Sequence, residues 1–589
     1  MNLPVEAALL PAISYDKSVK TELPEASSEQ SIPLADLMAN AALVRLTGGI
    51  SPAALGNAYS DWLAHLAMSP AKRIDLVNSA LRRWREWLLL TRGGKSESKP
   101  LVLTDKRFID PAWQRWPYNL LTAAFMQQEQ WWSEASRGVR GVSHHHEDVV
   151  DFTTRQLLDF FAPSNFIATN PVVLDETVKS GGTNLLFGLQ RMLQDWEKNC
   201  PGIKACVDKR YQVGVKVAVT AGKVVYRNRL MELIQYEPVG DRVHARPMLI
   251  VPAWIMKYYI LDLSPENSLV KYLVEHGYTV FMISWKNPGG EDRNIGFDDY
   301  RSLGIMAALD EIVRITGTPD VNAVGYCLGG TNLAIAAAAM ARDKDKRIAS
   351  ISMFAAQVDF HEPGELSLFI DESQVSFLEA MMANQGYLDT KQMAGAFQML
   401  RTNDLIYSHY VKQYLMGKPE TKGDLMAWNA DATRMPYRMH SEYLRSLFLH
   451  NDLAENRHRV NGRAISLGDI RVPIFAVGTV TDHVAPWKSV FKIHDFVPGE
   501  VCFVLTTGGH NAGVVSPPSA SYRRYQMASH ARKDGYVDAD TWQKEAPTFE
   551  GSWWPAWEQW LAQRSGTWTA PPPMGKALCD APGTYVLEP

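Results

Sequence analysis

Cys327 stands in the segment of this chain whose residue types most plainly suggest chemistry. It lies in the run GYCLGG, residues 325–330, between an apolar stretch and an alanine-rich one. Glycines two residues before and after a nucleophile are typical of a sharp strand-to-helix turn, because a β-carbon at either place would crowd the strained residue. Such a turn puts the sulfur at a helix N-terminus, which favours the thiolate. The run predicts a cysteine nucleophile, although a close-packed turn around a buried cysteine would use the same glycines.

An acidic residue and a histidine follow two later apolar runs. Asp482 comes shortly after the run 475–477, and His510 comes after the run 503–505 and two glycines. If both runs are strands, the two side chains stand at strand carboxyl ends, as Cys327 does. The order nucleophile, acid, histidine is that of the α/β-hydrolase fold. We therefore predict that His510 deprotonates Cys327 and that Asp482 orients His510 or stabilises its charge.

The same turn predicts the donors of an oxyanion hole. One N–H group comes from the residue after the nucleophile, here Leu328, and the other from the loop after an earlier strand. The run 248–251 is such a strand, and Ala253 or Trp254 follows it at the required place. His483 lies beside the acid in the same turn, and we expect it to be a structural hydrogen-bond partner.

Alternating strands and helices must position these residues. After Gly214 the hydrophobic period becomes that of strands, first in a leading antiparallel ribbon and then in the βα succession of a parallel sheet. The fold class predicted is therefore α/β, with an α/β-hydrolase fold whose mostly parallel sheet carries helices on both faces. We expect ribbon strands at 215–219, 224–226 and 230–236, further strands at 248–251, 279–284, 321–324, 348–354, 472–477 and 501–505, and helices at 268–276, 298–316 and 328–342.

Composition and period divide the chain into three parts. Residues 1–35 are rich in Pro, Ser and Glu without a sustained period, which predicts a mobile tail. Residues 36–205 are helical in pattern and rich in aromatic residues, and we interpret them as an α-helical N-terminal domain. Residues 206–589 form the predicted catalytic domain. Within it, strand alternation lapses from about 360 to 450, and such an insertion is usually a cap over the active site.

The first firm helix of the N-terminal domain follows Ser69-Pro70 and is closed by Gly93-Gly94. Its flanks hold seven Lys and Arg residues between positions 72 and 95. The helix therefore either binds an anionic or polymer surface, or packs by one face and exposes the other face to solvent. One face of the helix carries Ile74, Val77, Leu81, Trp84 and Leu88.

Charge and composition exclude several functions. The 589 residues carry a formal charge of −4, without the basic excess of a protein that neutralises many phosphates, so nucleic acid is not an expected partner. No run reaches the roughly 18 apolar residues that span a bilayer, and residues 1–17 lack the basic start of a secretory signal. We expect a cytoplasmic protein without a transmembrane segment.

Neither the cysteines nor a histidine cluster indicates a metal site. The five cysteines form no paired CxxC pattern or disulfide framework. His144, His145 and His146 are adjacent, and adjacent residues of a helix point in different directions, so we interpret them as a solvated face rather than metal ligands. The tryptophan-rich run 551–557 is interpreted as a C-terminal helix that packs on the sheet.

These motifs resemble those of the polyhydroxyalkanoate synthases, α/β-hydrolase-like enzymes with a cysteine nucleophile. The resemblance runs from about residue 100 to the end, and the length is similar to that of the single-subunit class I synthases. The chain departs from the usual residues at Met256, Thr402, Tyr407 and Asn511, and Met256 and Asn511 lie close to the predicted site. The motifs that carry the resemblance are residues 107–108, 112–113, 163–166, 168–171, 251–263, 284–288, 325–330, 403–406, 428–436, 482–487, 509–510 and 551–555.

The resemblance implies acyl transfer through Cys327, His510 and Asp482. The substrate would be an (R)-3-hydroxyacyl-CoA, with 3-hydroxybutyryl-CoA the expected one, and the products a polyester chain and free CoA. No cofactor or metal is implied, because the CoA thioester is itself the substrate. The implied partners are the growing polyester, the granule surface, phasin-type granule proteins and a second copy of the chain. The implied location is the cytoplasm, on polyester granules.

Keeping water from the acyl-enzyme is a further requirement, because hydrolysis competes with chain growth. The predicted cap meets it, and we expect Trp254, Trp428 and His483 to line the substrate channel. Two rival functions remain. A thioesterase or polyester depolymerase would use the same triad, since a triad does not reveal whether water or a hydroxyacyl group is the acceptor. A granule-coating structural protein with an inactive hydrolase domain is disfavoured by the intact triad.

Overall fold

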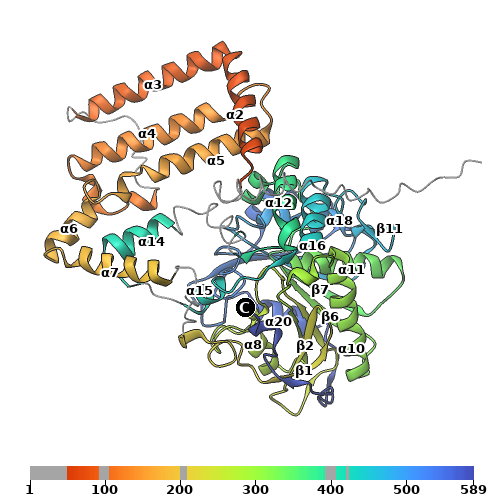
Figure 1. The fold of residues 1–589 in the computed structure, drawn as a ribbon. Coiled ribbons are helices and arrows are strands. Elements are labelled where there is room, and N and C mark those ends of the chain that lie inside the picture. The colour runs from red at the N-terminus through yellow and green to blue at the C-terminus, as the bar shows by residue number, and fades with distance from the viewer. Residues whose placement is uncertain (1–49, 92–104, 199–208, 391, 393–405, 420–422) are drawn as a thin grey trace, which may run out of the picture.

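The computed structural model describes residues 50–91, 105–198, 209–390, 392, 406–419 and 423–589. The predicted tail at 1–35, the boundary near 205, Cys200, Cys206 and the departure at Thr402 lie outside these residues. The described chain forms a helical N-terminal part and a larger part built on one sheet, as Figure 1 shows.

The sheet has eleven strands in the order β15-β14-β13-β12-β7-β6-β4-β5-β2-β1-β17. The six strands from β13 to β5 are parallel, and the strands outside them pair antiparallel. Strands β4, β5, β6 and β12 are buried along their whole length, as apolar runs covered on both faces must be. The strands of the sheet are β1 (Gly222–Arg227), β2 (Met231–Tyr236), β4 (Met248–Val251), β5 (Val280–Trp285), β6 (Val321–Tyr326), β7 (Ile348–Phe354), β12 (Ile474–Thr479), β13 (Glu500–Thr506), β14 (Arg524–Ala531), β15 (Thr548–Glu550) and β17 (Cys579–Asp580).

Helices cover the parallel strands, and this confirms the predicted fold class. Helix α11 (Leu328–Arg342) follows β6 directly, and α8 (Leu269–Glu275) precedes β5. The predicted helix at 298–316 is one helical segment made of α9 (Phe297–Asp299), a π-helical stretch η8 (Tyr300–Met306) and α10 (Ala307–Thr316). Shorter helices are α17 (Trp487–Phe491), α18 (Ile493–Phe496) and α19 (Ala539–Glu545).

The tryptophan-rich C-terminal run forms helix α20 (Trp554–Ala562), which packs on the sheet as predicted. Trp553, Trp554 and Trp557 are at most 1% exposed. The indole N–H of Trp557 donates to the hydroxyl of Ser352 in β7 at 2.9 Å. Both the apolar burial and the satisfied indole donor therefore attach α20 to the sheet.

The predicted strand at 215–219 is wrong. Residues 214–217 form a tight turn in which the N–H of Gly214 donates to the carbonyl of Val217 at 2.8 Å. Gly214 and Ala218 both have positive φ angles, 77° and 53°, which a strand does not allow. The valines of this run alternate as they would in a half-buried strand. In the structure, however, Val215 is 57% exposed and pairs with no strand.

The N-terminal part consists of helices that bury two small clusters of their own, and α3 does not pack by its predicted apolar face. Leu76 and Ser79 are the buried residues of α3. The indole N–H of Trp131 donates to the carbonyl of Leu76 at 3.0 Å, and Ser79 donates to Glu134 at 2.6 Å. The helices are α2 (Pro52–Ala67), α3 (Pro70–Thr91), α4 (Tyr118–Ser136), α5 (His144–Phe160), α6 (Pro171–Lys179) and α7 (Thr183–Lys198). The exposed residues of α3 include Ile74, Val77, Leu81 and Trp84, each 58–62% exposed.

The insertion between β7 and β12 joins the two parts of the molecule. A segment of it, α14 (Ser408–Tyr410) and η11 (Val411–Leu415), lies beside α7 (Figure 1). The side-chain N–H of Asn184 donates to the carbonyl of Leu415 at 2.8 Å. At its other end, Gln374 accepts the N–H of Ser51 at 2.7 Å. Other described helices of the insertion include α12 (Glu372–Gln385), α15 (Asp424–Asn429), α16 (Tyr437–Tyr443) and η12 (Leu444–Leu449).

Candidate active site

Cys327 occupies the sharp turn between β6 and α11. Its φ of 52° and ψ of −127° place it in a strained region for a residue with a β-carbon. A β-carbon on Gly325 would overlap Gly330, and one on Gly329 would overlap the carbonyl groups of Val251 and Pro252. The glycines are therefore required by close backbone approach, which is the local geometry that the motif predicts.

His510 and Asp482 lie together at the carboxyl ends of β13 and β12. The ring Nδ1 of His510 is 2.8 Å from the Oδ2 of Asp482. The other carboxylate oxygen accepts the backbone N–H groups of Val484 at 2.9 Å and Ala485 at 2.8 Å. The Asp482 side chain is fully buried and that of His510 is 13% exposed. The carboxylate is thus fixed at both oxygens, and it fixes one edge of the imidazole.

The charges around His510 favour its protonated form. Burial by itself lowers the pKa of His510, but the negative charges of Asp482 and Cys327 and the hydrogen bonds of both to the ring raise it well above its ordinary value. A histidine that holds its proton beside a cysteine sulfur can stabilise a thiolate and later protonate a leaving group. The arrangement can therefore carry out nucleophilic acyl transfer.

The candidate oxyanion donors Leu328 and Ala253 come from neighbouring segments. Leu328 begins α11, and the first N–H groups of a helix have no partner within the helix. The contact of Gly329 with Val251 and Pro252 brings the start of α11 against the loop that carries Ala253. The indole N–H of Trp285 donates to the carbonyl of Pro252 at 2.9 Å, which anchors this loop.

The two tryptophans expected in the channel are buried supports of the same loop. Trp254 is 1% exposed and stacks on Tyr300 with ring centres 4.1 Å apart. Trp428, at the end of α15, is 3% exposed and donates its indole N–H to the carbonyl of Lys257 at 2.7 Å. Their contact with a bound substrate stays a prediction.

His483 contacts the start of the inserted region. Its Nδ1 is 3.6 Å from the Oε1 of Glu365, and its carbonyl accepts the N–H of Glu365 at 3.1 Å. Its side chain is 44% exposed. The contacts are those of a residue that joins the loop after β12 to the start of the cap.

Tyr326, Asn511 and Tyr443 were not assigned a role from the sequence. The phenol of Tyr326 donates to the Oδ1 of Asn511 at 2.6 Å, and the Nδ2 of Asn511 donates to the Oδ1 of Asn429 at 3.1 Å. Burial first, and then the negative charge of Cys327, raises the pKa of Tyr443. Asn511 stood out in the sequence only as a departure from the resemblance, and Tyr443 gave no signal.

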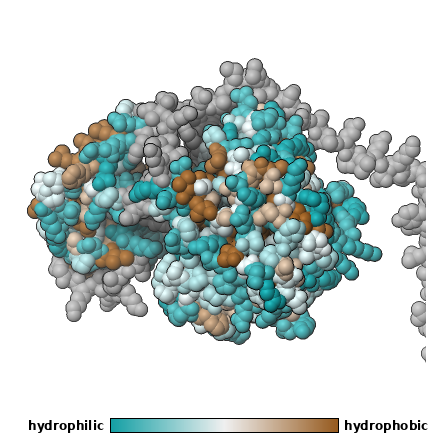
Figure 2. All heavy atoms as spheres, turned by 90° about the horizontal axis from the view of Figure 1, so that it is seen from below, coloured by the Kyte–Doolittle hydropathy of each residue, from teal (hydrophilic) through white to brown (hydrophobic). Residues whose placement is uncertain are grey.

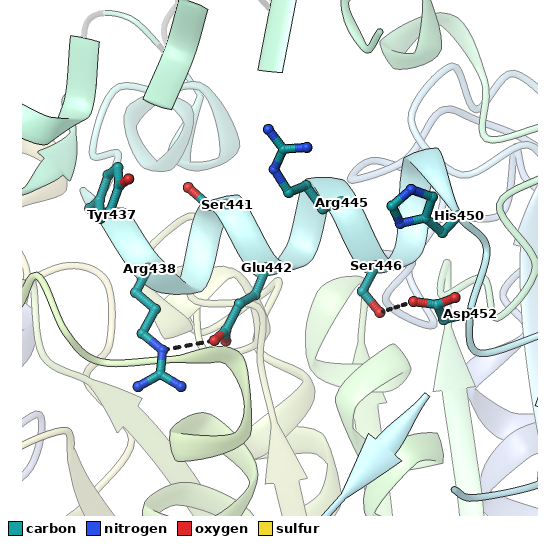
Figure 3. Close-up of a pocket in the computed structure, with 8 residues that line it drawn as sticks. All are labelled: Tyr437, Arg438, Ser441, Glu442, Arg445, Ser446, His450 and Asp452. Atoms are coloured by element: carbon teal, nitrogen blue, oxygen red, sulfur yellow. Dashed lines mark hydrogen bonds and ion pairs between the residues drawn. The ribbon is translucent and has the colours of Figure 1, made fainter. Parts of the chain in front are cut away.

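The groove that lies along α16 and η12 is not this site. It has a volume of about 360 Å³, and none of the three candidate catalytic residues lines it. Figure 3 shows two contacts among its lining side chains, between Arg438 and Glu442 at 2.8 Å and between Ser446 and Asp452 at 3.0 Å. Arg445 binds Glu379 of α12 at 2.7 Å. The groove therefore offers paired charges rather than free ligand-binding groups.

The histidine run at 144–146 begins helix α5. His144 is fully exposed, His146 lies 2.6 Å from Asp61, and His145 lies 3.6 Å from Asp371. Among the described residues, no group of three His, Cys, Asp or Glu side chains is arranged to hold a metal ion. No helix in the described part of the chain is both long and apolar enough to cross a membrane.

Comparison with known proteins identifies the family. A family model described as "Poly-beta-hydroxybutyrate polymerase (PhaC) N-terminus" matches residues 104–273. A second, "Poly-beta-hydroxybutyrate polymerase N terminal", matches 31–72, and the α/β-hydrolase fold matches 246–517. The "Poly(3-hydroxyalkanoate) polymerase subunit PhaC" of Rhizobium etli is 40% identical over 508 residues, which are 85% of this chain and 79% of that protein. This chain belongs to the poly-β-hydroxybutyrate polymerase family.

Other relatives extend the same match over most of the chain. The "Poly(3-hydroxyalkanoate) polymerase" of Methylorubrum extorquens is 39% identical over 540 residues, 89% of this chain and 88% of that protein. The Cupriavidus necator "Poly(3-hydroxyalkanoate) polymerase subunit PhaC" is 34% identical over 548 residues, 91% of each chain. Membership in this polymerase family makes the protein an acyltransferase of polyhydroxyalkanoate biosynthesis, as the motifs predict.

Proposed function

We propose that the chain polymerises (R)-3-hydroxyacyl-CoA, with 3-hydroxybutyryl-CoA as its main substrate, through a covalent acyl group on Cys327. The observation that carries the proposal is the strained cysteine beside a histidine whose other ring nitrogen binds a buried carboxylate. The names of the relatives support the polymer, and the resemblance of the motifs supports the acyl-CoA.

The first half-reaction begins with transfer of the Cys327 thiol proton to His510, which gives the thiolate and protonated histidine described above. The thiolate then attacks the thioester carbonyl carbon. The negative charge on the carbonyl oxygen is stabilised by the N–H groups of Leu328 and Ala253. The carbon–sulfur bond to CoA then breaks, and His510 returns the proton to the departing CoA thiolate. The enzyme is left with a thioester on Cys327 and with both nitrogens of His510 in their starting states.

In the second half-reaction a 3-hydroxyl group gives its proton to the His510–Asp482 pair and attacks the carbonyl carbon of an acyl thioester. The ester bond forms as the carbon–sulfur bond of that thioester breaks, and His510 returns the proton to the departing thiolate. An alcohol needs a base, and the His510–Asp482 pair supplies one at the same place. Cysteine suits the sequence because exchange of one thioester for another is nearly neutral in free energy. The chain thus stays activated until the ester forms, whereas an oxyester on serine would lose that drive.

The decisive experiment compares the products made from purified 3-hydroxybutyryl-CoA. We expect thiol release to be accompanied by insoluble polymer, because the inserted region limits access of water to the acyl-enzyme. Release of free 3-hydroxybutyrate without polymer would favour the thioesterase or depolymerase alternative. Thiol release by the Cys327→Ala variant at the normal rate would remove Cys327 from the mechanism.

We further propose that the N-terminal helices attach the enzyme to the polyester granule in the cytoplasm. The support is the unusual exposure of apolar side chains on α3 and α7. Figure 2 shows hydrophobic patches on the side of the molecule that these helices form. On α7 the exposed apolar residues are Leu186, Phe187, Leu189, Met192, Leu193 and Trp196.

The exposed faces of α3 and α7 could also bind the other proposed partners, which are a second copy of the chain and phasin-type proteins. Flotation of the purified enzyme with washed polyester granules tests attachment without any other protein. Gel filtration over a range of concentrations tests the homodimer. Substitution of exposed α7 residues that changes the oligomeric state but leaves flotation intact would assign the face to the dimer.

A further inference from the structure

Helix α15 of the inserted region places two successive residues on the two loops that flank Cys327. Trp428 donates its indole N–H to the carbonyl of Lys257, in the loop that carries the candidate oxyanion donor Ala253. Asn429 accepts the side-chain N–H of Asn511, the residue directly after His510. One short cap helix therefore contacts both the loop after β4 and the loop after β13.

The Asn511 side chain is held from both ends. Its Oδ1 accepts the phenol of Tyr326, the residue directly before Cys327, at 2.6 Å. Its Nδ2 donates to Asn429 at 3.1 Å. The Tyr326 side chain is buried and its ring lies 5.7 Å from the His510 ring. A chain of two hydrogen bonds thus runs from the nucleophile turn through the histidine loop to the cap.

His510 needs such a second anchor for a geometric reason. Asp482 holds the imidazole at Nδ1 alone, so small rotations of the backbone at 510–511 swing the opposite nitrogen toward or away from the sulfur. Misplacement by about 1 Å is enough to cost a large factor in rate. Fixing the Asn511 side chain on two sides restrains that backbone.

We propose that Asn511 is a positioning residue that couples the cap to the catalytic histidine, with Asn429 and Tyr326 as its two partners. When α15 is seated, the Asn429–Asn511 contact holds the His510 loop in its reactive position, and Trp428 holds the oxyanion loop at the same time. When α15 moves to admit acyl-CoA, both loops lose a restraint. Seating of the cap thereby completes the site that it covers.

The proposal rests on the function proposed above, so its test includes a reading that needs no polymer. The first measurement is the single-turnover rate of CoA release at saturating substrate. The second is the rate at which iodoacetamide alkylates Cys327, followed by mass spectrometry of the peptide, because alkylation reports the thiolate that His510 stabilises.

The informative variants separate the hydrogen bonds from the space they occupy. Asn429→Leu removes the acceptor, whereas Asn429→Asp keeps an oxygen at the same position. Asn511→Leu removes both bonds, and Tyr326→Phe removes only the phenol donor. Since α15 ends at Asn429 and the side chain is exposed, neither Asn429 variant is expected to disturb folding.

We expect Asn511→Leu to slow acylation at saturating substrate by about tenfold, and Asn429→Leu and Tyr326→Phe by about threefold each, the range that one or two hydrogen bonds supply. Asn429→Asp should stay within about twofold of the unaltered enzyme. Because Asn429 acts through Asn511, the double leucine variant should be no slower than Asn511→Leu alone. Alkylation of Cys327 should follow the same order.

Several results would overturn the inference. Equal rates for Asn429→Leu and Asn429→Asp would show that the hydrogen bond does not matter. Strictly multiplicative effects in the double variant would show that the two residues act separately, and an effect confined to KM would indicate substrate binding instead. Failure of the proposed function looks different: Cys327→Ala would then still release CoA, whatever the order of the asparagine variants.

Discussion

The catalytic edge of the sheet and the N-terminal helices place their apolar residues in opposite ways. Strands β4, β6 and β12 are buried completely, and each ends at a loop that carries a candidate catalytic group or faces one. In α3 and α7 many apolar residues are exposed, and Trp84 and Trp196 are 62% and 67% exposed. A region that buries its apolar groups needs no partner to cover them, whereas a region that exposes apolar groups is suited to binding another surface. The difference agrees with the proposal that the sheet carries the chemistry and the helices attach the enzyme to the granule.

In the described part of the chain, the insertion connects the two regions. The contacts between them include the hydrogen bonds of Ser51 with Gln374 and of Asn184 with Leu415. Because α15 belongs to the same insertion, the element that touches the catalytic loops is also connected to the N-terminal helices. We therefore expect mutations to separate chemistry from attachment, although the insertion connects the two regions.

The largest expected effect is on the sheet side. Cys327→Ala should abolish CoA release, since it removes the nucleophile, and should leave the fold intact because Cys327 is partly exposed and the change is small. Cys502→Ala is the matched control, since Cys502 is buried in β13 away from the turn. Thiol release and circular dichroism of the two variants test this. Comparable loss of thiol release in both variants would show that the turn has no special role compared with the rest of the sheet.

Asp482→Asn should separate the two half-reactions. A thiol is a much stronger acid than an alcohol, so the alcohol depends more on a base. We therefore expect acylation of Cys327 within about tenfold of normal and chain growth slower by about a hundredfold or more. Loss of the carboxylate charge also lowers the pKa of His510, which that charge raises. The imidazolium is then lost at lower pH, and the alkaline limb of CoA release should move to lower pH.

Rapid-quench measurement of acyl-enzyme beside polymer length tests the Asp482 prediction. If acylation and chain growth fall by the same factor, Asp482 only orients His510. An unchanged pH profile would show that its charge does not support the imidazolium.

A smaller effect on chemistry, with a clear effect on attachment, is expected from the N-terminal side. Trp84→Glu places a charge on the exposed apolar face of α3 and should reduce binding to polyester granules severalfold while leaving single-turnover acylation unchanged. Asn78→Glu adds the same charge at an exposed polar position of that helix. Granule flotation and acylation of both variants give the answer. Equal losses of flotation in the two would point to charge alone, not to the apolar face.

The smallest expected effect is at the link between the regions. A β-carbon on Gly188 in α7 would overlap the backbone carbonyl of Tyr414, so Gly188→Ala should unseat the 411–417 segment although alanine favours the helix itself. Gly56→Ala in α2 meets no atom within 4 Å and should stabilise its helix by up to about 1 kcal/mol. Hydrogen exchange should increase around 411–417 only in Gly188→Ala. Unchanged exchange there would mean that the link tolerates the displacement.

The sequence predicted the parts whose signal is local. The glycines around Cys327 predict a close-packed turn, the run at 248–251 is apolar throughout and the run at 348–354 is mostly so. Strand positions and the order of the candidate residues therefore followed directly. The strand expected at 215–219 failed because alternating valines also fit a turn whose backbone φ is positive. Local pattern does not show whether an apolar residue has a partner.

The same limit explains what was missed at the site and on α3. The Asn429–Asn511 contact joins residues 82 apart in the chain, and Asn184 meets Leu415 across 231 residues, so no local pattern announces either. The period of α3 correctly predicts a helix with an apolar face. The helix packs instead through the face that carries Leu76 and Ser79, and only the tertiary structure shows this. Roles that depend on such contacts required the structure.

The central claim is that the acyl group passes through Cys327. The most direct measurement mixes enzyme with 3-hydroxybutyryl-CoA, quenches the first turnover within milliseconds and weighs the peptide that contains Cys327. The account predicts a hydroxybutyryl thioester on this peptide that forms as fast as CoA is released. CoA release with the Cys327 peptide unmodified, or with the acyl group on another residue, would contradict it.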